Sequence, residues 1–202
     1  ETALKRRQGR DVPFFMTGPT ARGLPASCRP QNIVEIHADR PFRLENWIVE
    51  PLSIPHDTPA PVAYTIQAQT TRVGVFTDFG HITASIRRQM STLDVAVLEF
   101  NHDLQMLMTG NYPEHLKDRV RGPYGHLSNT QAGELLETGA TSRLKHVILA
   151  HLSQENNTID KAYLACSEAL NRAGLTNTKI HVASQAEALK PIAAKRIIRP
   201  PS

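Results

Sequence analysis

The segment that decides the fold class begins Val147-Ile-Leu-Ala150-His151 and continues to residue 183. Its first four residues form an apolar run with the length and composition of a buried strand. Apolar residues then recur at steps of three and four over residues 159–173, as on one face of an amphipathic helix, and Gly174 is placed to end that helix. A second apolar run at residues 180–183 completes a strand, helix and strand, which predicts a layered domain of the α/β or α+β class.

The rest of the chain carries the same kinds of pattern. Strand composition recurs in short runs at residues 12–16, 33–36, 47–54, 63–67, 73–77 and 95–100, and helical periodicity recurs at residues 83–90 and 128–137. Residues 2–7 are compatible with a short helix, whereas residues 110–127, rich in glycine, proline and tyrosine, are predicted to form an irregular surface loop. No repeat or linker is evident, so we expect one domain over residues 1–202 with a basic tail at residues 190–202.

Composition excludes several classes of protein. With 40% hydrophobic and 21% charged residues, the chain can build a core and is not typical of disordered sequence. Its net charge of +4 slightly favours polyanionic partners. Cys28 and Cys166 form no disulfide framework or thiolate metal motif, and no apolar run approaches the roughly 20 residues of a membrane span. We therefore expect a cytoplasmic protein without a membrane partner, and its 9 histidines suggest metal or acid–base chemistry.

Three predicted strands lead directly into residues that bind metals in other proteins. The run from Glu50 ends before His56, residues 73–77 lead into Asp78, and residues 147–150 lead into His151. A strand fixes the position of such a residue while the loop beyond leaves room for an ion and a substrate. Imidazole nitrogens and a bridging carboxylate suit a pair of Zn²⁺, Mn²⁺ or Fe ions. For any one of these residues, a turn or capped surface position is the alternative interpretation.

The sequence around these strand ends carries a resemblance to a known family. The motifs are Ile54-Pro-His56-Asp57, Val75-Phe-Thr-Asp78-Phe-Gly80, Leu98-Glu-Phe-Asn101-His102-Asp103, Gly125-His126-Leu-Ser128-Asn129 and His151-Leu-Ser153-Gln-Glu-Asn156-Asn157. Together, over about residues 12–184, the chain resembles the YycJ/WalJ group of the metallo-β-lactamase superfamily, and more distantly it is similar to RNase Z.

The resemblance implies both a fold and a metal centre. The implied fold is an αββα sandwich with two divalent metal ions at one edge, zinc or manganese being expected and iron an alternative. His56 would complete a three-histidine site, Asp78 would bridge the two ions, and His151 would bind the second ion. The family's H-x-H-x-D-H motif is absent from these 202 residues. We therefore expect that motif immediately upstream of Glu1, and we expect the first strands of one sheet to be missing here.

His126 lies in a loop that the sequence places at the start of a helix. Ser128 and Gln131 have capping-box spacing, and the amide groups at such a helix start favour an anion. The resemblance implies that His126 contacts the scissile phosphate and either stabilises its charge or protonates the leaving oxygen. The alternative is a residue beside a helix cap that packs against Tyr124. Ser128, Asn129 and Asn157 are predicted to lie at the substrate.

The remaining polar candidates have two interpretations each. Asn101 and His102 follow a strand and are predicted to support the metal ligands through hydrogen bonds, although they also precede a possible helix around Leu104. Asn157 is likewise a suitable cap for the helix beginning at residue 159. Four histidines are predicted to be structural or exposed, and His81 stands near Asp78 only in sequence. Those four are His37, His115, His146 and His181.

The functional prediction is hydrolysis of nucleic acid. Resemblance to the YycJ/WalJ group implies a metal-dependent phosphodiesterase, and within that class a DNA exonuclease with Asp78 and His126 as catalytic residues. A second hypothesis keeps the fold and changes the bond, because the superfamily also hydrolyses thioesters, lactones and β-lactams. A third is a non-catalytic module that binds nucleic acid without metal.

Overall fold

The computed structural model describes residues 12–193, and most of its strands form one sheet of seven. The strand order is β3-β4-β5-β6-β7-β8-β9, which follows the chain. The first four strands pair antiparallel and the last four pair parallel. Their bounds are β3 Phe42–Leu44, β4 Trp47–Ser53, β5 Val62–Ala68, β6 Thr71–Phe76, β7 Val95–Glu99, β8 His146–Ala150 and β9 Lys179–Val182.

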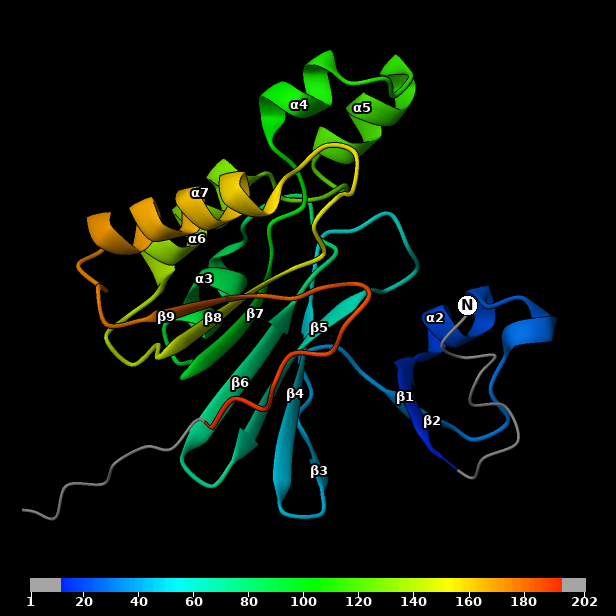
Figure 1. Ribbon diagram of the computed structural model, residues 1–202. Helices are drawn as coiled ribbons and strands as arrows, with labels where there is room; N and C mark the ends of the chain where they lie inside the picture. The colour runs from blue at the N-terminus through cyan, green and yellow to red at the C-terminus, as the bar shows by residue number, and fades with distance from the viewer. Residues whose placement is uncertain (1–11, 194–202) are drawn as a thin grey trace, which may run out of the picture.

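Helices connect the parallel strands and cover one face of this sheet (Figure 1). Helix α3 (Ala84–Met90) follows β6, and α7 (Ile159–Arg172) joins β8 to β9. The connection from β7 to β8 contains α4 (Leu104–Thr109), α5 (Glu114–Arg121) and α6 (Asn129–Gly139). Figure 1 shows α3, α6 and α7 against the sheet, whereas α4 and α5 form a separate pair beyond one end of the strands.

The core lies between the parallel strands and these helices. Phe76, Leu98 and Leu149 are fully buried there, on the sheet face that Leu135 and Cys166 approach from α6 and α7. Each buried apolar side chain of this size stabilises the fold by about 1.5–3 kcal/mol. This packing fixes β6, β7 and β8 side by side, so that their carboxyl ends meet at one edge.

A smaller sheet begins the described chain. Strands β1 (Phe14–Thr17) and β2 (Ile33–Ile36) pair parallel, and α2 (Gly18–Gly23) and the short 3-10 helix Ala26–Cys28 lie between them. Stacking of Phe15 on Phe42, with ring centroids 5.1 Å apart, joins β1 to the edge of the large sheet. The Tyr64 hydroxyl adds a hydrogen bond to the carbonyl of Phe15 at 3.2 Å.

The predicted α/β class is confirmed, and each predicted strand and helix within residues 12–193 has a counterpart. The prediction that residues 110–127 are irregular is wrong, because α5 occupies eight of them. Pro113 precedes that helix and is its N-cap residue. Proline does not break a helix there, because a backbone N–H at that position would have no partner within the helix. Helix α2 and strand β3 are not among the elements predicted from the sequence. The helix expected at residues 2–7 lies outside the described residues, as does most of the basic tail.

Candidate metal centre

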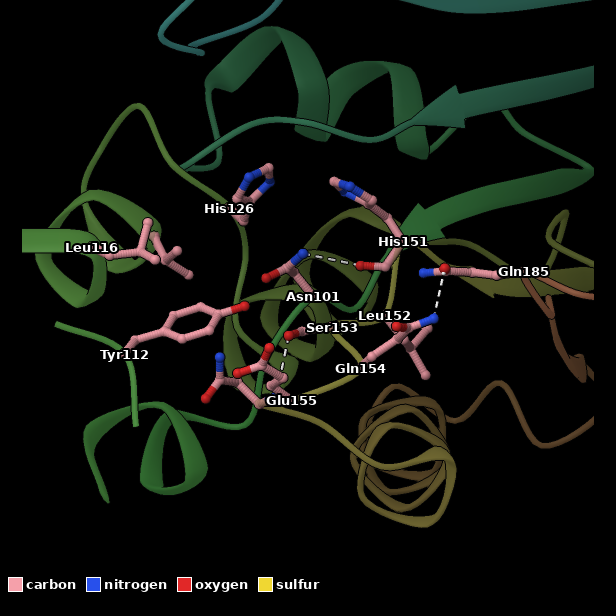
Figure 2. A pocket seen from close by; sticks show the side chains of 12 residues that line it. Asn101, Tyr112, Leu116, His126, His151, Leu152, Ser153, Gln154, Glu155 and Gln185 are labelled. Atoms are coloured by element: carbon pink, nitrogen blue, oxygen red, sulfur yellow. Dashed lines mark hydrogen bonds between the residues drawn. The ribbon is translucent and has the colours of Figure 1, made fainter. Parts of the chain in front are cut away.

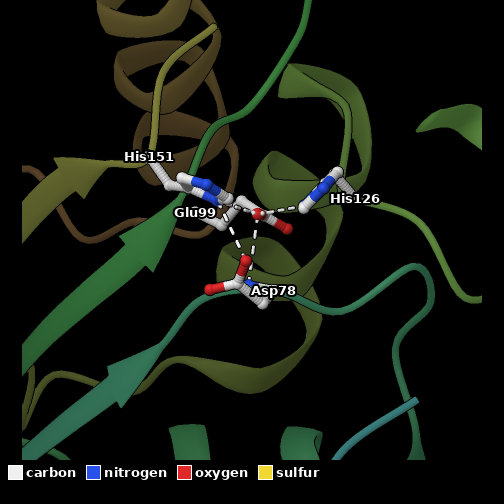
Figure 3. A group of neighbouring side chains, drawn as sticks. All are labelled: Asp78, Glu99, His126 and His151. Carbon is white, nitrogen blue, oxygen red and sulfur yellow. Dashed lines mark hydrogen bonds and ion pairs between the residues drawn. The ribbon is translucent and has the colours of Figure 1, made fainter. Parts of the chain in front are cut away.

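The candidate centre lies at the carboxyl ends of β6, β7 and β8. Phe76, Leu98 and Leu149 stand level in the strand register, so the residues just beyond them meet. Asp78 follows β6, Glu99 ends β7, and His151 follows β8 directly. Figure 3 shows these three side chains converging with His126, which comes from the loop before α6.

Glu99 is the centre of this group, and it is fully buried. Its Oε2 accepts hydrogen bonds from Nδ1 of His151 at 2.6 Å and Nδ1 of His126 at 2.9 Å. Backbone amides complete its partners, with Asp78 N at 3.2 Å and Leu127 N at 2.9 Å. Burial raises the pKa of this carboxyl, but the hydrogen bonds from His126 and His151 outweigh burial and lower the pKa to about 2. Glu99 is therefore a carboxylate with all its partners supplied by the protein.

The Glu99 carboxylate orients both imidazoles in the same way. Because each Nδ1–H is directed at Glu99, each Nε2 is left free to bind a metal or a substrate. The two rings meet edge to face with centroids 5.0 Å apart. The hydrogen bond to Glu99 also raises the pKa of His151. This carboxylate–histidine arrangement is the one that holds metal-binding histidines in other proteins.

Two residues of the centre have an uncommon backbone conformation. Asp78 has a φ of 64° and His151 a φ of 56°, in the left-handed region that few residues other than glycine adopt. Such conformations cost about 1–3 kcal/mol each and persist where surrounding structure enforces them. Here they turn the chain sharply at the ends of β6 and β8, so that both side chains point toward Glu99.

His56 approaches the centre from the loop after β4. Its Nδ1 donates to the carbonyl of Gly125 at 3.2 Å, and its Nε2 lies 3.5 Å from Asp57 Oδ1 and 3.9 Å from Asp78 Oδ1. Two ligand atoms on one tetrahedral Zn²⁺ with bonds near 2 Å stand roughly 3.4 Å apart, so His56 Nε2 and Asp78 Oδ1 are slightly farther apart than that. The structure places His56 near Asp78, and its predicted role as a ligand in a three-histidine site stays a prediction.

The loop that carries His126 is fixed by backbone packing. A Cβ atom on Gly80 would stand 2.5 Å from the carbonyl oxygen of Gly122 and 2.6 Å from the amide nitrogen of Gly125. On the other side, His126 N donates to the carbonyl of Val120 in α5 at 2.8 Å. Ser128 and Gln131 form the predicted capping box at the start of α6. These contacts leave the His126 ring little freedom to move away from Glu99.

The two asparagines predicted at the substrate are buried. Asn129 and Asn157 exchange reciprocal amide hydrogen bonds of 2.9 Å. Asn157 also donates to the carbonyls of Phe100 and Asn101, so the pair ties the end of β7 to the starts of α6 and α7. Ser128 is buried as well, as a helix cap. Contact of these three residues with substrate stays a prediction, since their observed bonds are to the protein.

Asn101 and His102 have different positions. The Asn101 side chain donates to the carbonyl of His151 at 3.0 Å, and so supports the strained turn there. His102 is buried, and no described residue forms a hydrogen bond with its Nδ1. Burial lowers the pKa of His102 to about 4. The predicted helix around Leu104 is present as α4, and Asp103 is its N-cap residue.

Sequence reasoning missed Glu99. It lies inside the motif Leu98-Glu-Phe-Asn101, at the end of the strand predicted over residues 95–100. The available signal was an acidic residue at the end of an otherwise apolar run, because a carboxylate is rarely buried without specific partners.

The donor set fits a divalent metal ion. One donor atom from each of Asp78, Glu99, His126 and His151 lies within 4.8 Å of the others. Glu99 already accepts four hydrogen bonds, which suits a role in orienting the histidines, whereas Asp78, His126 and His151 each offer a donor atom that could bind an ion, with His56 nearby. Carboxylate and imidazole donors in this combination suit Zn²⁺, Mn²⁺ or Fe.

A family model for the β-lactamase superfamily domain matches residues 2–152. The chain belongs to the metallo-β-lactamase superfamily. The resemblance seen in the sequence is thus confirmed, and the parallel strands whose ends carry Asp78, Glu99 and His151 belong to the fold of that superfamily.

Curated relatives in the superfamily cover a part of this chain. Exodeoxyribonuclease YycJ of Bacillus anthracis is 31% identical over 126 residues, which are 62% of this chain and 48% of that protein. Exodeoxyribonuclease WalJ of Streptococcus pneumoniae serotype 2 is 31% identical over 127 residues, 63% of this chain and 47% of that protein. The chain spans about half the length of these curated relatives.

Solved structures of other superfamily members share the fold. The metallo-β-lactamase fold protein YhfI of Bacillus subtilis has a TM-score of 0.58 at 13% identity, covering 85% of this chain and 61% of its own. Zn²⁺-bound PqqB of Methylobacterium extorquens also has a TM-score of 0.58, at 14% identity, covering 89% of this chain and 65% of its own.

Within residues 12–193, none of the helices combines the length and the apolar character that crossing a membrane requires.

Proposed function

We propose that this chain belongs to a metal-dependent phosphodiesterase that acts on nucleic acid as a DNA exonuclease. The observation that carries the proposal is the buried Glu99 carboxylate, which accepts the Nδ1–H of His126 and of His151 and leaves Nε2 of each ring free, in a cluster that includes Asp78 and whose donor atoms lie within 4.8 Å of one another. The names of the YycJ and WalJ relatives support DNA as the substrate. A net charge of +4 favours a polyanion in general.

Asp78, His56 and His151 would hold divalent metal ions, of which we expect two, zinc or manganese, with iron as an alternative. Ions bound there supply Lewis-acid stabilisation of the charge that develops on a phosphate. The protein's own residues supply orientation and proton transfer. Glu99 holds the proton on Nδ1 of His126, so Nε2 of that ring faces the site and can carry a proton to the leaving oxygen.

Near the centre, the exposed side chain of Arg119 is held in place by an ion pair with Asp57. Arg119 Nε donates to Asp57 Oδ2 at 2.6 Å, next to His56. This hydrogen bond lowers the pKa of Asp57, and it ties α5 to the loop that carries His56. The guanidinium remains largely exposed, so it can also approach a phosphate of a strand entering the site.

The test is hydrolysis by the metal-loaded protein in its natural full length. End-labelled single-stranded DNA and RNA of one sequence should be compared with thioester, lactone and β-lactam substrates. We expect stepwise release of nucleotides from DNA, a loss of at least about 100-fold in Asp78→Asn, and no change in His115→Ala, whose side chain is exposed on α5. Hydrolysis of a thioester, lactone or β-lactam but not of DNA would replace the proposal with the other enzyme class. DNA binding without hydrolysis of any substrate would favour the non-catalytic module.

A further inference from the structure

A second hollow opens beside the candidate metal centre, and it shares two residues with that centre. We call it the side pocket, a cavity of about 350 Å³ whose walls include Tyr112, Leu116, Gln154 and Gln185. His126 and His151 line its edge, so a molecule in the side pocket lies next to the reacting groups. Its volume is at the small end of the roughly 300–1,000 Å³ of sites for small molecules.

The walls of the side pocket differ in chemistry from one side to the other. Figure 2 shows Tyr112 and Leu116 on one side, with Gln154 and Gln185 opposite. The Gln154 amide donates to Gln185 Oε1 at 2.8 Å. Among residues 12–193, no partner is found for the Gln154 carbonyl oxygen or for the Gln185 amide nitrogen. A ligand there would meet an aromatic ring and an aliphatic side chain on one side and a free acceptor and donor on the other.

The aromatic wall is held by the helix pair above the sheet. Tyr112 lies in the turn between α4 and α5, where it is half buried. The buried Lys117 of α5 joins the two helices, because its Nζ donates to the carbonyl of Met108 in α4 at 2.9 Å, and within α5 it also donates to Glu114 Oε1 at 3.0 Å. The backbone on both sides of Tyr112 therefore belongs to two helices that are joined to each other.

We propose that the side pocket binds the nucleobase of the nucleotide that carries the scissile phosphate. This inference rests on the proposed function and specifies its substrate as nucleic acid with an unpaired terminal base. A flat ring that lies against an aromatic and an aliphatic side chain on one side, with amide groups opposite, matches the shape and hydrogen-bonding groups of a base. A base can enter such a cavity only when it is unpaired and unstacked.

The first test compares two single-stranded DNA substrates that differ only at the end where cleavage begins. One has a normal terminal base and the other has an abasic site there. Stacking of one base on an aromatic side chain changes affinity by about 5- to 150-fold, so the wild-type enzyme should prefer the first substrate by a factor in that range. Tyr112→Ala should bring the two rates together, Tyr112→Phe should keep the preference, and the matched control Tyr163→Ala, on exposed α7 surface, should keep it too.

Three outcomes would overturn the side-pocket proposal while the enzyme remains active. They are equal rates on both substrates in the wild type, an unchanged preference in Tyr112→Ala, and equal rates on single-stranded and blunt duplex ends. If Tyr112→Ala does not fold, Gln154→Ala takes its place, because that side chain is exposed and its loss should also reduce the preference.

The second test measures base binding without turnover. The metal-loaded protein is mixed with single-stranded DNA whose terminal base is 2-aminopurine and whose terminal linkage is a phosphorothioate that resists hydrolysis. Stacking on Tyr112 should quench the fluorescence, and Tyr112→Ala should weaken binding about 5- to 150-fold. Quenching with no hydrolysis of ordinary DNA would contradict the proposed function and leave the pocket assignment standing. Hydrolysis without quenching would do the reverse.

Discussion

Strand β8 has a histidine at each end, and the two histidines have different surroundings. At its carboxyl end, His151 contacts the buried Glu99, with the His126 ring centroid 5.0 Å away. At its amino end, His146 contacts His181 of β9 directly, with Nδ1 and Nε2 3.0 Å apart and ring centroids at 5.3 Å. The rings are similarly spaced in the two pairs, so spacing does not distinguish them.

The difference between the pairs is the carboxylate. The hydrogen bond that His151 donates to Glu99 raises the pKa of His151, against the effect of burial. His146 has no such partner, and burial followed by the positive charges of His181 and Lys179 lowers its pKa. At the carboxyl end each imidazole is oriented by an anion and has a free nitrogen directed outward. At the amino end the contact joins one nitrogen of each ring, Nδ1 of His146 and Nε2 of His181. A pair of adjacent histidines becomes a candidate metal site here only because a buried anion orients it.

Removing that anion should have the largest effect. In Glu99→Gln the side-chain volume is kept, but the charge that orients His126 and His151 is lost. Loss of a group that orients metal ligands typically weakens metal binding 10- to 100-fold, so we expect a decrease of about that size in affinity and a similar one in turnover. Breaking a buried charged network also costs about 3 kcal/mol of folding free energy. Chelator competition, turnover and denaturant unfolding measure the three quantities.

The matched control for Glu99→Gln is His181→Gln at the other end of the strand. It removes one member of the directly bonded pair and should leave metal affinity and turnover at their wild-type values. If both variants reduced metal binding equally, the buried carboxylate would not be the feature that separates the two ends of β8.

The loop next to the carboxyl end should show the second largest effect. Gly80→Ala places a Cβ within about 2.5 Å of backbone atoms of Gly122 and Pro123, and backbone cannot move aside as a flexible side chain does. We expect a loss of about 1–3 kcal/mol in unfolding free energy. The backbone that would have to move, at residues 122–125, leads directly into His126. Turnover should therefore fall by up to about 100-fold, the loss typical when a reacting group is misplaced by about 1 Å.

Gly23→Ala is the control for this substitution. The Cβ atom added there would find its nearest neighbour, Pro59 Cγ, at 3.5 Å, which is an ordinary contact. Its effect on unfolding free energy should stay within about 0.5 kcal/mol. Equal losses in both glycine variants, with turnover unchanged, would show that the loop does not need the close backbone contact at Gly80.

The sequence predicts where the strands end better than it predicts the backbone conformation and the side-chain contacts of the residues at and beyond those ends. The apolar runs located β6, β7 and β8, and the residues after them placed Asp78 and His151 at one edge. No pattern in the sequence indicates that Asp78 and His151 adopt left-handed backbone conformations, because that depends on the packing of the whole edge. The role of Glu99 could not be predicted, because it depends on partners that are distant in sequence, among them His126 and His151.

The smallest expected effect is a difference in pH dependence between the two ends of β8. In the metal-free protein the folded-state pKa of His151 is raised above 6.5, so its contribution to stability is complete below that pH and is lost as the pH rises through the folded-state pKa. The folded-state pKa of His146 is lowered, so its contribution is present above pH 6.5 and is lost as the pH falls through the folded-state pKa.

The two histidine variants should therefore respond to pH in opposite directions. His151→Gln should destabilise the protein more at pH 5.5 than at pH 8.5, and His146→Gln should destabilise it less at pH 5.5 than at pH 8.5, as measured by denaturant unfolding at about those two values. Imidazole NMR titration of the wild-type protein supplies the direct readout, with the midpoint of His151 above that of His146. If both rings titrated together, Glu99 would not be ionised beside His151, and the carboxylate would lose its role in distinguishing a metal-binding end of the strand from a structural one.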